Sequence, residues 1–304
     1  MSTPLGSAAP GPDADHPVDT FTQVDQSELD VGLEREVNAA VGETLVSLQD
    51  VTMQFGGLKA MDSVSFDIKR GEILGLIGPN GAGKTTCFNA MTGVYTPTSG
   101  KVVFDGTAIR RMKRNQITRM GIARTFQNIR LFASMTALEN VAVGIDARHR
   151  TSVVGAVFRS PRHRREERIA YDRGMELLEF VGIADRAHEP ARSLPYGYQR
   201  RLEIARALAT EPKLLCLDEP AAGFNPAEKV QLMGLIQEIR NQGYTVLLIE
   251  HDMRLVMGVT DRIVVLEFGR KIAEGTPDVI RKDPAVIAAY LGVTDNADED
   301  EDEE

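Results

Sequence analysis

A glycine-rich loop at residues 78–85 has the residue types and the spacing that bind phosphate. It lies within GEILGLIGPNGAGKTTCFNAMTG, where GPNGAGKT matches the P-loop pattern GxxxxGK[ST] between an apolar run and a helical pattern. Its glycines let successive backbone amides wrap the β-phosphate of a nucleotide, and the helix start adds its dipole. A chance match to so short a pattern is the alternative, and the order of strand, loop and helix argues against it.

Within this loop we predict that Lys84 reaches the β- and γ-phosphates and that Thr85 ligates Mg²⁺. The predicted nucleotide contacts are Gly78, Pro79, Asn80, Gly81, Ala82, Gly83, Lys84, Thr85 and Thr86.

Two adjacent carboxylates, Asp218 and Glu219, follow the apolar run of KLLCLDEP at residues 213–220. Such a run predicts a buried parallel strand, and ligands bind at the carboxyl ends of these strands. Asp218 is the predicted Mg²⁺ ligand, and Glu219 is the predicted base that polarises an attacking water. A solvated strand end is the alternative, but it explains neither the pairing nor the position.

A third strand pattern, YTVLLIEHD, ends beside His251. A lone histidine at a strand end is usually structural. Because three strand ends would converge on one phosphate site, we predict instead that His251 contacts the γ-phosphate.

The stretch SLPYGYQRRLEIARALA, residues 193–209, predicts an irregular turn and then a helix that begins near Tyr198. Pro195 and Gly197 hold the turn, and Gly197 would let another group approach the backbone closely. A helix start offers unpaired amides and a partial positive charge to an anion. Taken alone, an ordinary helix start is the simpler interpretation. The apolar stripe of this helix consists of Leu202, Ala205, Leu208 and Ala209, with Arg200, Arg201 and Arg206 set off from it.

The composition indicates a globular chain whose negative charge is concentrated at its two ends. Of the 304 residues, 42% are hydrophobic, which suffices for the core of one large or two small domains. The net charge of −9 divides into −8 for residues 1–43, −8 for residues 295–304 and +7 for residues 44–294. We predict a disordered acidic extension at 1–43, a domain at 44–294 and a disordered acidic tail at 295–304.

The same sequence argues against several classes of protein. No basic, apolar start typical of a secretory signal is present, and no apolar run approaches the ~18 residues of a membrane span, so a cytoplasmic chain is expected. Cys87 and Cys216 lie in apolar runs without a partner spacing, which predicts neither a disulfide nor a zinc site. The aromatic content of 6% is low and aromatic residues are not interleaved with the basic ones, which predicts no nucleic-acid partner.

Taken in order, these motifs make residues 44 to about 292 resemble the nucleotide-binding subunit of an ATP-binding cassette (ABC) transporter. The resemblance implies an α/β P-loop NTPase fold with an antiparallel β subdomain near the start and a helical subdomain at about 128–205. It implies ATP and Mg²⁺ as cofactors. It also implies that Phe55 stacks on adenine, and that Gln127, in RTFQN, senses Mg²⁺ and meets the membrane subunits.

The stretch at 193–209 occupies the signature position of this family, which usually reads LSGGQ. The resemblance implies that this turn binds the γ-phosphate of ATP held by the P-loop of a second subunit, so that Tyr196, Gly197 and the D-loop residue Asn225 would be nucleotide contacts. Pro195 stands where the signature serine would be, Tyr196 replaces a glycine, and Asn225 replaces an aspartate. Loss of one phosphate donor would slow the turnover by as much as ~10²-fold.

Five longer stretches narrow the resemblance to the ATPase subunits of branched-chain amino acid importers, and to the longer of the two kinds that serve one transporter. They are RTFQNIRLF, LPYGYQRRLEIARAL, DEPAAGFNP, LLIEHDMRLVMGVTDRIVVL and DPAVIAAYLG. This implies ATP hydrolysis coupled to transport at the cytoplasmic face of the cell membrane. The implied partners are a second ATPase subunit, identical or related, the transmembrane permease subunits and, indirectly, an extracytoplasmic substrate-binding protein.

Two kinds of alternative stay open. One is the ATPase of another ABC system, for import of another amino acid, an amide or urea, or for lipopolysaccharide export. The other is a soluble ABC ATPase without a transport role, although those usually carry two cassettes or a coiled-coil insertion. The insertion at about 148–168 is apolar and then arginine-rich, so contact with lipid or permease is an alternative to a solvated loop.

Overall fold

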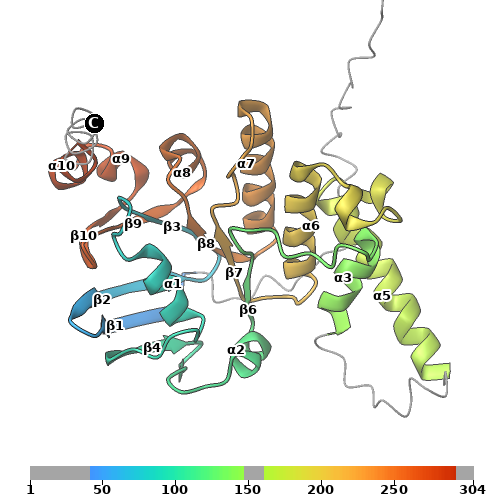
Figure 1. Ribbon diagram of the computed structural model, residues 1–304, viewed down its shortest axis with the longest axis horizontal. Helices are drawn as coiled ribbons and strands as arrows, with labels where there is room; N and C mark the ends of the chain where they lie inside the picture. The colour runs from blue at the N-terminus through green and yellow to red at the C-terminus, as the bar shows by residue number, and fades with distance from the viewer. Residues whose placement is uncertain (1–41, 147–160, 292–304) are drawn as a thin grey trace, which may run out of the picture. The chain divides into compact units, whose positions relative to one another are not determined.

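The computed structural model describes residues 42–146 and 161–291 (Figure 1). The acidic extension before residue 42, the acidic tail, and most of the insertion at 148–168 lie outside these residues. Within the described ranges, no helix has both the length and the apolar character needed to cross a membrane.

A mainly parallel sheet runs through the middle of the fold and positions the predicted site. Its order is β10-β9-β3-β8-β7-β6, with β10 antiparallel to β9 and the other neighbours parallel. Its strands are β3 (Ile73–Ile77), β6 (Ile122–Arg124), β7 (Leu214–Asp218), β8 (Thr245–Ile249), β9 (Arg262–Glu267) and β10 (Arg270–Gly275). Every residue of β3, β7 and β8 is buried, as expected for strands covered on both faces.

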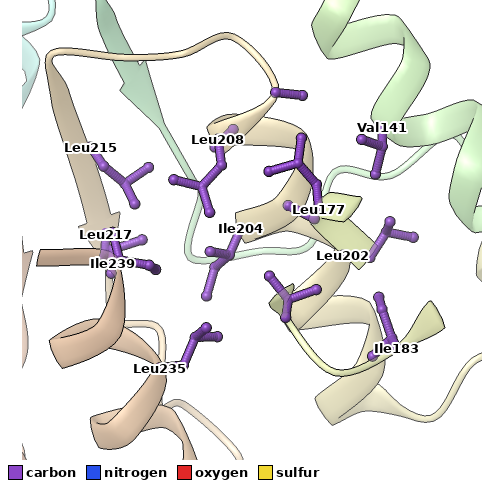
Figure 2. Packing of buried hydrophobic residues seen from close by; sticks show 14 of the residues in the cluster. Val141, Leu177, Ile183, Leu202, Ile204, Leu208, Leu215, Leu217, Leu235 and Ile239 are labelled. Carbon is purple, nitrogen blue, oxygen red and sulfur yellow. The ribbon is translucent and has the colours of Figure 1, made fainter. Parts of the chain in front are cut away.

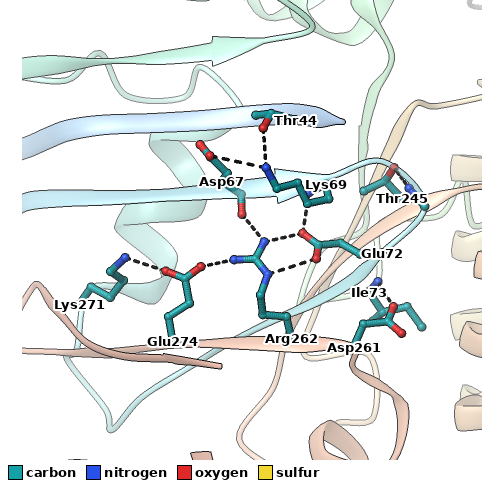
Figure 3. Close-up of polar contacts among 11 residues, drawn as sticks. Thr44, Asp67, Lys69, Glu72, Ile73, Thr245, Asp261, Arg262, Lys271 and Glu274 are labelled. Atoms are coloured by element: carbon teal, nitrogen blue, oxygen red, sulfur yellow. Dashed lines mark hydrogen bonds and ion pairs between the residues drawn. The ribbon is translucent and has the colours of Figure 1, made fainter. Parts of the chain in front are cut away.

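A second, antiparallel sheet follows the order β2-β1-β4-β5, which confirms the predicted β subdomain. Its strands are β1 (Thr44–Phe55), β2 (Leu58–Lys69), β4 (Ser99–Phe104) and β5 (Thr107–Ala108). Arg262 on β9 joins the two sheets, since its guanidinium donates to the Asp67 carbonyl of β2 at 2.6 Å and to Glu72 at 2.6 Å (Figure 3). The same guanidinium also pairs with Glu274 on β10.

Helices cover both faces of the parallel sheet. In Figure 1, α7 to α10 lie along one side of it, whereas α1 lies on the other side with the antiparallel sheet. These helices are α1 (Lys84–Met91), α7 (Pro226–Asn241), α8 (Met253–Val259), α9 (Pro277–Ile280) and α10 (Pro284–Leu291). A short helix, α2 (Arg114–Met120), precedes the edge strand β6.

A group of helices between β6 and β7 occupies the region where we predict the helical subdomain. It contains α3 (Ala137–Asp146), α5 (Pro161–Phe180), two 3₁₀ turns (Ala184–Arg186 and Ala191–Ser193) and α6 (Tyr196–Leu208). Figure 2 shows the buried side chains of α6 between those of β7 and α7 on one side and those of α3 and α5 on the other. Because α6 packs against both groups, a movement of α3 and α5 would also move α6 relative to the sheet.

Two details of the α6 prediction are wrong. The helix begins at Tyr196, with Pro195 as its N-cap, instead of near Tyr198, because the fixed φ of proline (−53° here) suits a residue that leads into a helix. Arg200 is not set off from the core: its side chain is fully buried.

Candidate active site

The predicted strand, loop and helix of the P-loop are confirmed as β3, residues 78–83 and α1. Lys84 lies at the first position of α1 and donates from Nζ to the carbonyls of Gly78, at 2.6 Å, and Pro79, at 2.8 Å. Partial burial lowers the pKa of Lys84, while the nearby Glu219 carboxylate opposes that shift. The ammonium therefore lies within the loop and close to the predicted base.

The P-loop glycines at both ends of the loop fit where no other residue would. Gly83 has a left-handed φ of 96°, and a Cβ there would lie 2.6 Å from the Ala60 carbonyl oxygen. At Gly78 a Cβ would lie 2.1 Å from the carbonyl oxygen of Leu266. The loop is thus wedged against β2 and β9, which holds its shape before any phosphate binds.

The carboxyl ends of β7 and β8 and the segment that follows β6 bring the three predicted catalytic residues together. Gln127 donates from Nε2 to Oε2 of Glu219 at 2.7 Å, and His251 Nδ1 lies 3.9 Å from Oε1 of the same carboxylate. Glu219 has a left-handed φ of 46°, a conformation that non-glycine residues keep only where the surrounding structure imposes it. Its side chain is 23% exposed and that of His251 is 66% exposed, so both reach solvent at this edge.

Asp218, the predicted Mg²⁺ ligand, is buried and paired with an arginine that the sequence reasoning missed. Arg124 donates from Nη2 to Oδ2 of Asp218 at 3.0 Å and from Nη1 to Oδ1 of Asn89 at 2.8 Å. Burial raises the pKa of Asp218, and the Arg124 guanidinium opposes that rise. The only sequence signal for this role is the place of Arg124 in RTFQN, three residues before Gln127.

The donor set at this edge fits magnesium, because Thr85, Gln127 and Asp218 offer only hard oxygen ligands. Thr85 is exposed at the start of α1. Among the described residues, no group of three or more histidine, cysteine, aspartate or glutamate side chains forms a metal cage. Magnesium here would take further oxygens from phosphate and water, as this ion usually does.

Arg200 ties the start of α6 to the segment that carries Gln127. Its guanidinium donates to the carbonyls of Phe126, at 2.6 Å, and Gln127, at 2.7 Å, and to Oε2 of the buried Glu203 at 2.9 Å. It also donates to the hydroxyl of Tyr196 at 3.0 Å. The sequence pattern missed this role because the partners at 126 and 127 are more than 70 residues away in the chain.

The predicted signature contacts lie next to the D-loop of the same chain. The rings of Tyr196 and Phe224 meet edge to face with centroids 6.2 Å apart. Gly197 lies in the first turn of α6, and a Cβ there would be 3.4 Å from Oε1 of Glu228. Asn225 caps α7, because its side chain accepts the Glu228 amide at 2.9 Å while the Glu228 side chain accepts the Asn225 amide. Their contacts with nucleotide stay predictions.

Phe55, the predicted adenine platform, is the last residue of β1 and is 46% exposed. The edge-to-face partner of this ring is Tyr95, with centroids 5.2 Å apart. The ring is thus held at its edge while part of its surface faces solvent. Stacking on adenine stays a prediction.

Glu250 is a third functional candidate that the sequence reasoning missed. It is buried, and it accepts the Ala221 amide at 2.8 Å and the His251 amide at 3.2 Å. Burial raises the pKa of this carboxyl, and these amides oppose the rise. Glu250 therefore fixes the start of the D-loop relative to His251.

Comparisons with known families agree with this geometry. The family model described as ABC transporter matches residues 61–222, and a second, described as branched-chain amino acid ATP-binding cassette transporter, matches residues 270–296. The chain is 47% identical over 253 residues to the high-affinity branched-chain amino acid transport ATP-binding protein LivG of Salmonella typhimurium, covering 83% of this chain and 99% of that protein. It is also 47% identical over 249 residues to BraF of Pseudomonas aeruginosa, covering 82% and 98%.

Solved structures of ATP-binding cassettes have the same fold. The ADP conformation of MJ1267, an ATP-binding cassette of an ABC transporter, superposes with a TM-score of 0.72 at 31% identity, over 82% of this chain and 99% of that one. A dimeric post-hydrolysis state of the cassette MJ0796, bound to ADP and Pi, gives a TM-score of 0.65 at 27% identity, over 76% and 98%.

Proposed function

The chain belongs to the family of ABC transporter ATPases, and from this premise we propose that it powers an importer of branched-chain amino acids. The observation that carries the substrate class is the match to LivG and BraF over nearly their whole length. The match of residues 270–296 to the branched-chain family model supports the same class from a separate part of the chain.

In the proposed hydrolysis, Lys84 turns from the Gly78 and Pro79 carbonyls to the β- and γ-phosphates of ATP. Glu219 polarises the attacking water, and the hydrogen bond from Gln127 fixes its carboxylate for that task. His251 approaches the γ-phosphate from the same edge. Thr85, Gln127 and Asp218 would hold Mg²⁺, which neutralises phosphate charge when it is bound.

The second half of each site would come from another ATPase subunit, identical or related. The first turn of α6 carries amides that have no acceptor within the helix, and Tyr196 and Gly197 lie in that turn. They would face the γ-phosphate of ATP in the partner's P-loop, with the helix dipole favouring its charge. The dimeric, ADP- and Pi-bound state of MJ0796 supports this arrangement by analogy.

Exposed apolar residues that follow Gln127 in the chain suit a contact with a permease. Phe132, Met135 and Val143 lie in or near the segment that leads from Gln127 into α3, and each is at least 36% exposed. Exposed apolar side chains close in sequence to the predicted catalytic glutamine support a protein contact there. We therefore place the chain on the cytoplasmic face of the membrane, bound to permease subunits that receive substrate from an extracytoplasmic binding protein.

Reconstitution with a branched-chain amino acid permease and its binding protein from the same organism tests this function. The full chain should copurify with the permease and support ATP-dependent uptake of leucine, isoleucine or valine into vesicles, and Lys84→Ala should abolish uptake. Uptake of urea, an amide or another amino acid in place of these would overturn the substrate class. A chain that hydrolyses ATP without binding any permease would overturn the transport role.

A further inference from the structure

The C-terminal stretch DPAVIAAYLG has no role in the site described above, yet it packs against the base of the P-loop. Residues Pro284–Leu291 form α10, which lies with α9 on the side of the sheet opposite α1 (Figure 1). Tyr290 of α10 packs against a buried cluster that includes Ile77, the last residue of β3, and Val265 of β9. The P-loop therefore starts between α1 on one face of the sheet and Tyr290 on the other.

The hydroxyl of Tyr290 lies near the amide of Gly78, the first glycine of the P-loop and the residue that follows Ile77. Its oxygen is buried and makes no hydrogen bond of good geometry with any residue in the described ranges 42–146 and 161–291. The Gly78 amide nevertheless lies close enough to stabilise the phenolate, which opposes the rise that burial causes in the pKa of Tyr290. A buried hydroxyl without a partner gains free energy if it forms a hydrogen bond with a nearby amide.

Gly78 is the point where such a bond would have an effect. Its Cα is wedged between the Leu266 carbonyl and Ala82, so this end of the loop has little room to move. On its carbonyl side the Gly78 peptide is held by Lys84 at 2.6 Å. When Lys84 turns to phosphate, as the proposed function requires, that contact is given up, and a hydrogen bond at the amide would still hold this peptide.

We propose that Tyr290 is a positioning residue of the P-loop, whose hydroxyl accepts a hydrogen bond from the Gly78 amide and holds the base of the loop while Lys84 binds phosphate. The proposal rests on the proposed function, because it concerns the same nucleotide site. It gives the C-terminal helix a direct effect on nucleotide affinity, in addition to its packing on the sheet.

The test compares two variants of the full chain, Tyr290→Phe and Val286→Ala. Tyr290→Phe removes the hydroxyl and keeps the ring. Val286→Ala removes apolar volume from the same buried cluster and leaves the hydroxyl in place. Equilibrium titration with Mg·ATP should show a roughly three- to tenfold higher Kd for Tyr290→Phe, the range expected for one neutral hydrogen bond. Hydrogen exchange of the ATP-bound protein should be faster at the Gly78 amide in this variant only.

Thermal melting separates positioning from packing. Val286→Ala should lower Tm and leave the Kd within about twofold of the parent, whereas Tyr290→Phe should raise the Kd with Tm unchanged or slightly higher. An unchanged Kd and an unchanged Gly78 exchange rate in Tyr290→Phe would overturn the inference and leave the proposed function intact. If the Kd rises in both variants in proportion to the fall in Tm, the inference is also overturned, because packing alone would then explain the higher Kd. A parent chain that binds no ATP would overturn both.

Discussion

Gln127 and Glu219 lie 92 residues apart in the sequence and are joined by a hydrogen bond of 2.7 Å from Nε2 to Oε2. Gln127 lies in the segment that leads into the helical subdomain, whereas Glu219 follows the central strand β7. Because Arg200 of α6 holds the carbonyl of Gln127, a movement of the helical part would be felt at the carboxylate that we predict to be the base. The pair therefore gives a physical route between the proposed permease contact and this predicted base.

The first prediction concerns Glu219→Gln, which keeps the size of the side chain and removes the base. We expect ATP binding to persist and turnover to fall by about 10²-fold or more, since general bases contribute on that scale. The ATP-bound dimer should accumulate on size-exclusion chromatography with Mg·ATP. Lys84→Ala is the matched comparison: it should weaken ATP binding itself, because it removes the cation from the loop.

A monomeric Glu219→Gln chain with demonstrably full nucleotide occupancy would contradict this prediction and, with it, the composite site. Turnover close to that of the parent would show that Glu219 is not the base.

The second prediction concerns Arg200→Met, which removes a fully buried guanidinium. Glu203 would lose its cationic partner, and the carbonyls of Phe126 and Gln127 would lose their donor. Breaking a buried pair on one side costs about 3–5 kcal/mol, so the urea midpoint should fall markedly. The double variant Arg200→Met with Glu203→Gln should recover part of the loss, because it leaves no uncompensated charge.

Arg192→Met is the control for the second prediction, since Arg192 is exposed just before the same helix. It should change the free energy of unfolding by less than about 0.5 kcal/mol. Equal losses of unfolding free energy in Arg192→Met and Arg200→Met would refute the assigned role of Arg200.

The third prediction follows from the raised pKa of Glu250. Burial is the main cause, so the folded state binds a proton on Glu250 more tightly than the unfolded state does. The stability that this group contributes is present below its unfolded pKa and is lost as pH rises through its folded pKa. The free energy of unfolding of Glu250→Gln, measured in urea relative to the parent, should therefore rise as pH rises from about 5 to 8.

Glu179→Gln serves as the exposed comparison for Glu250→Gln, and it should show no such trend. If the difference in free energy of unfolding between Glu250→Gln and the parent is the same at every pH, burial of the Glu250 charge does not lower the stability of the parent.

The fourth prediction concerns Pro195→Ser at the N-cap of α6. A serine hydroxyl has one hydrogen to donate to the partner's γ-phosphate and lone pairs that accept the amide of Tyr198, so both roles are compatible. Capping stabilises by about 1 kcal/mol, which offsets the loss of up to about 1 kcal/mol from the removal of proline. We expect higher ATPase turnover in the permease-bound dimer with Tm nearly unchanged.

Pro195→Ala distinguishes the hydroxyl from the new backbone amide, because it adds only the amide. A rise in turnover as large in Pro195→Ala as in Pro195→Ser would rule out the hydroxyl as the cause.

The local order of residues was enough to predict the P-loop and the carboxylates at the end of β7, whereas the antiparallel sheet was implied by the family resemblance. In each of these the chemistry depends on neighbours in the chain: Gly83 and Lys84 are adjacent, and Asp218 and Glu219 directly follow the apolar run that forms β7. Alternation and apolar runs also mark these strands as buried. A single stretch of sequence therefore contains both the residue and the element that positions it.

Only the tertiary structure decided which distant groups hold these residues. A helical pattern treats an arginine as polar and places Arg200 outside the core, yet it is buried because the carbonyls of residues 126 and 127 accept hydrogen bonds from its two terminal nitrogens. The pairings of Arg124 with Asp218, of Gln127 with Glu219, and of Tyr290 with the base of the P-loop join elements far apart in the chain. Local periodicity reports the face of an element, whereas the free energy of a buried polar group depends on partners that the folded chain alone brings within reach.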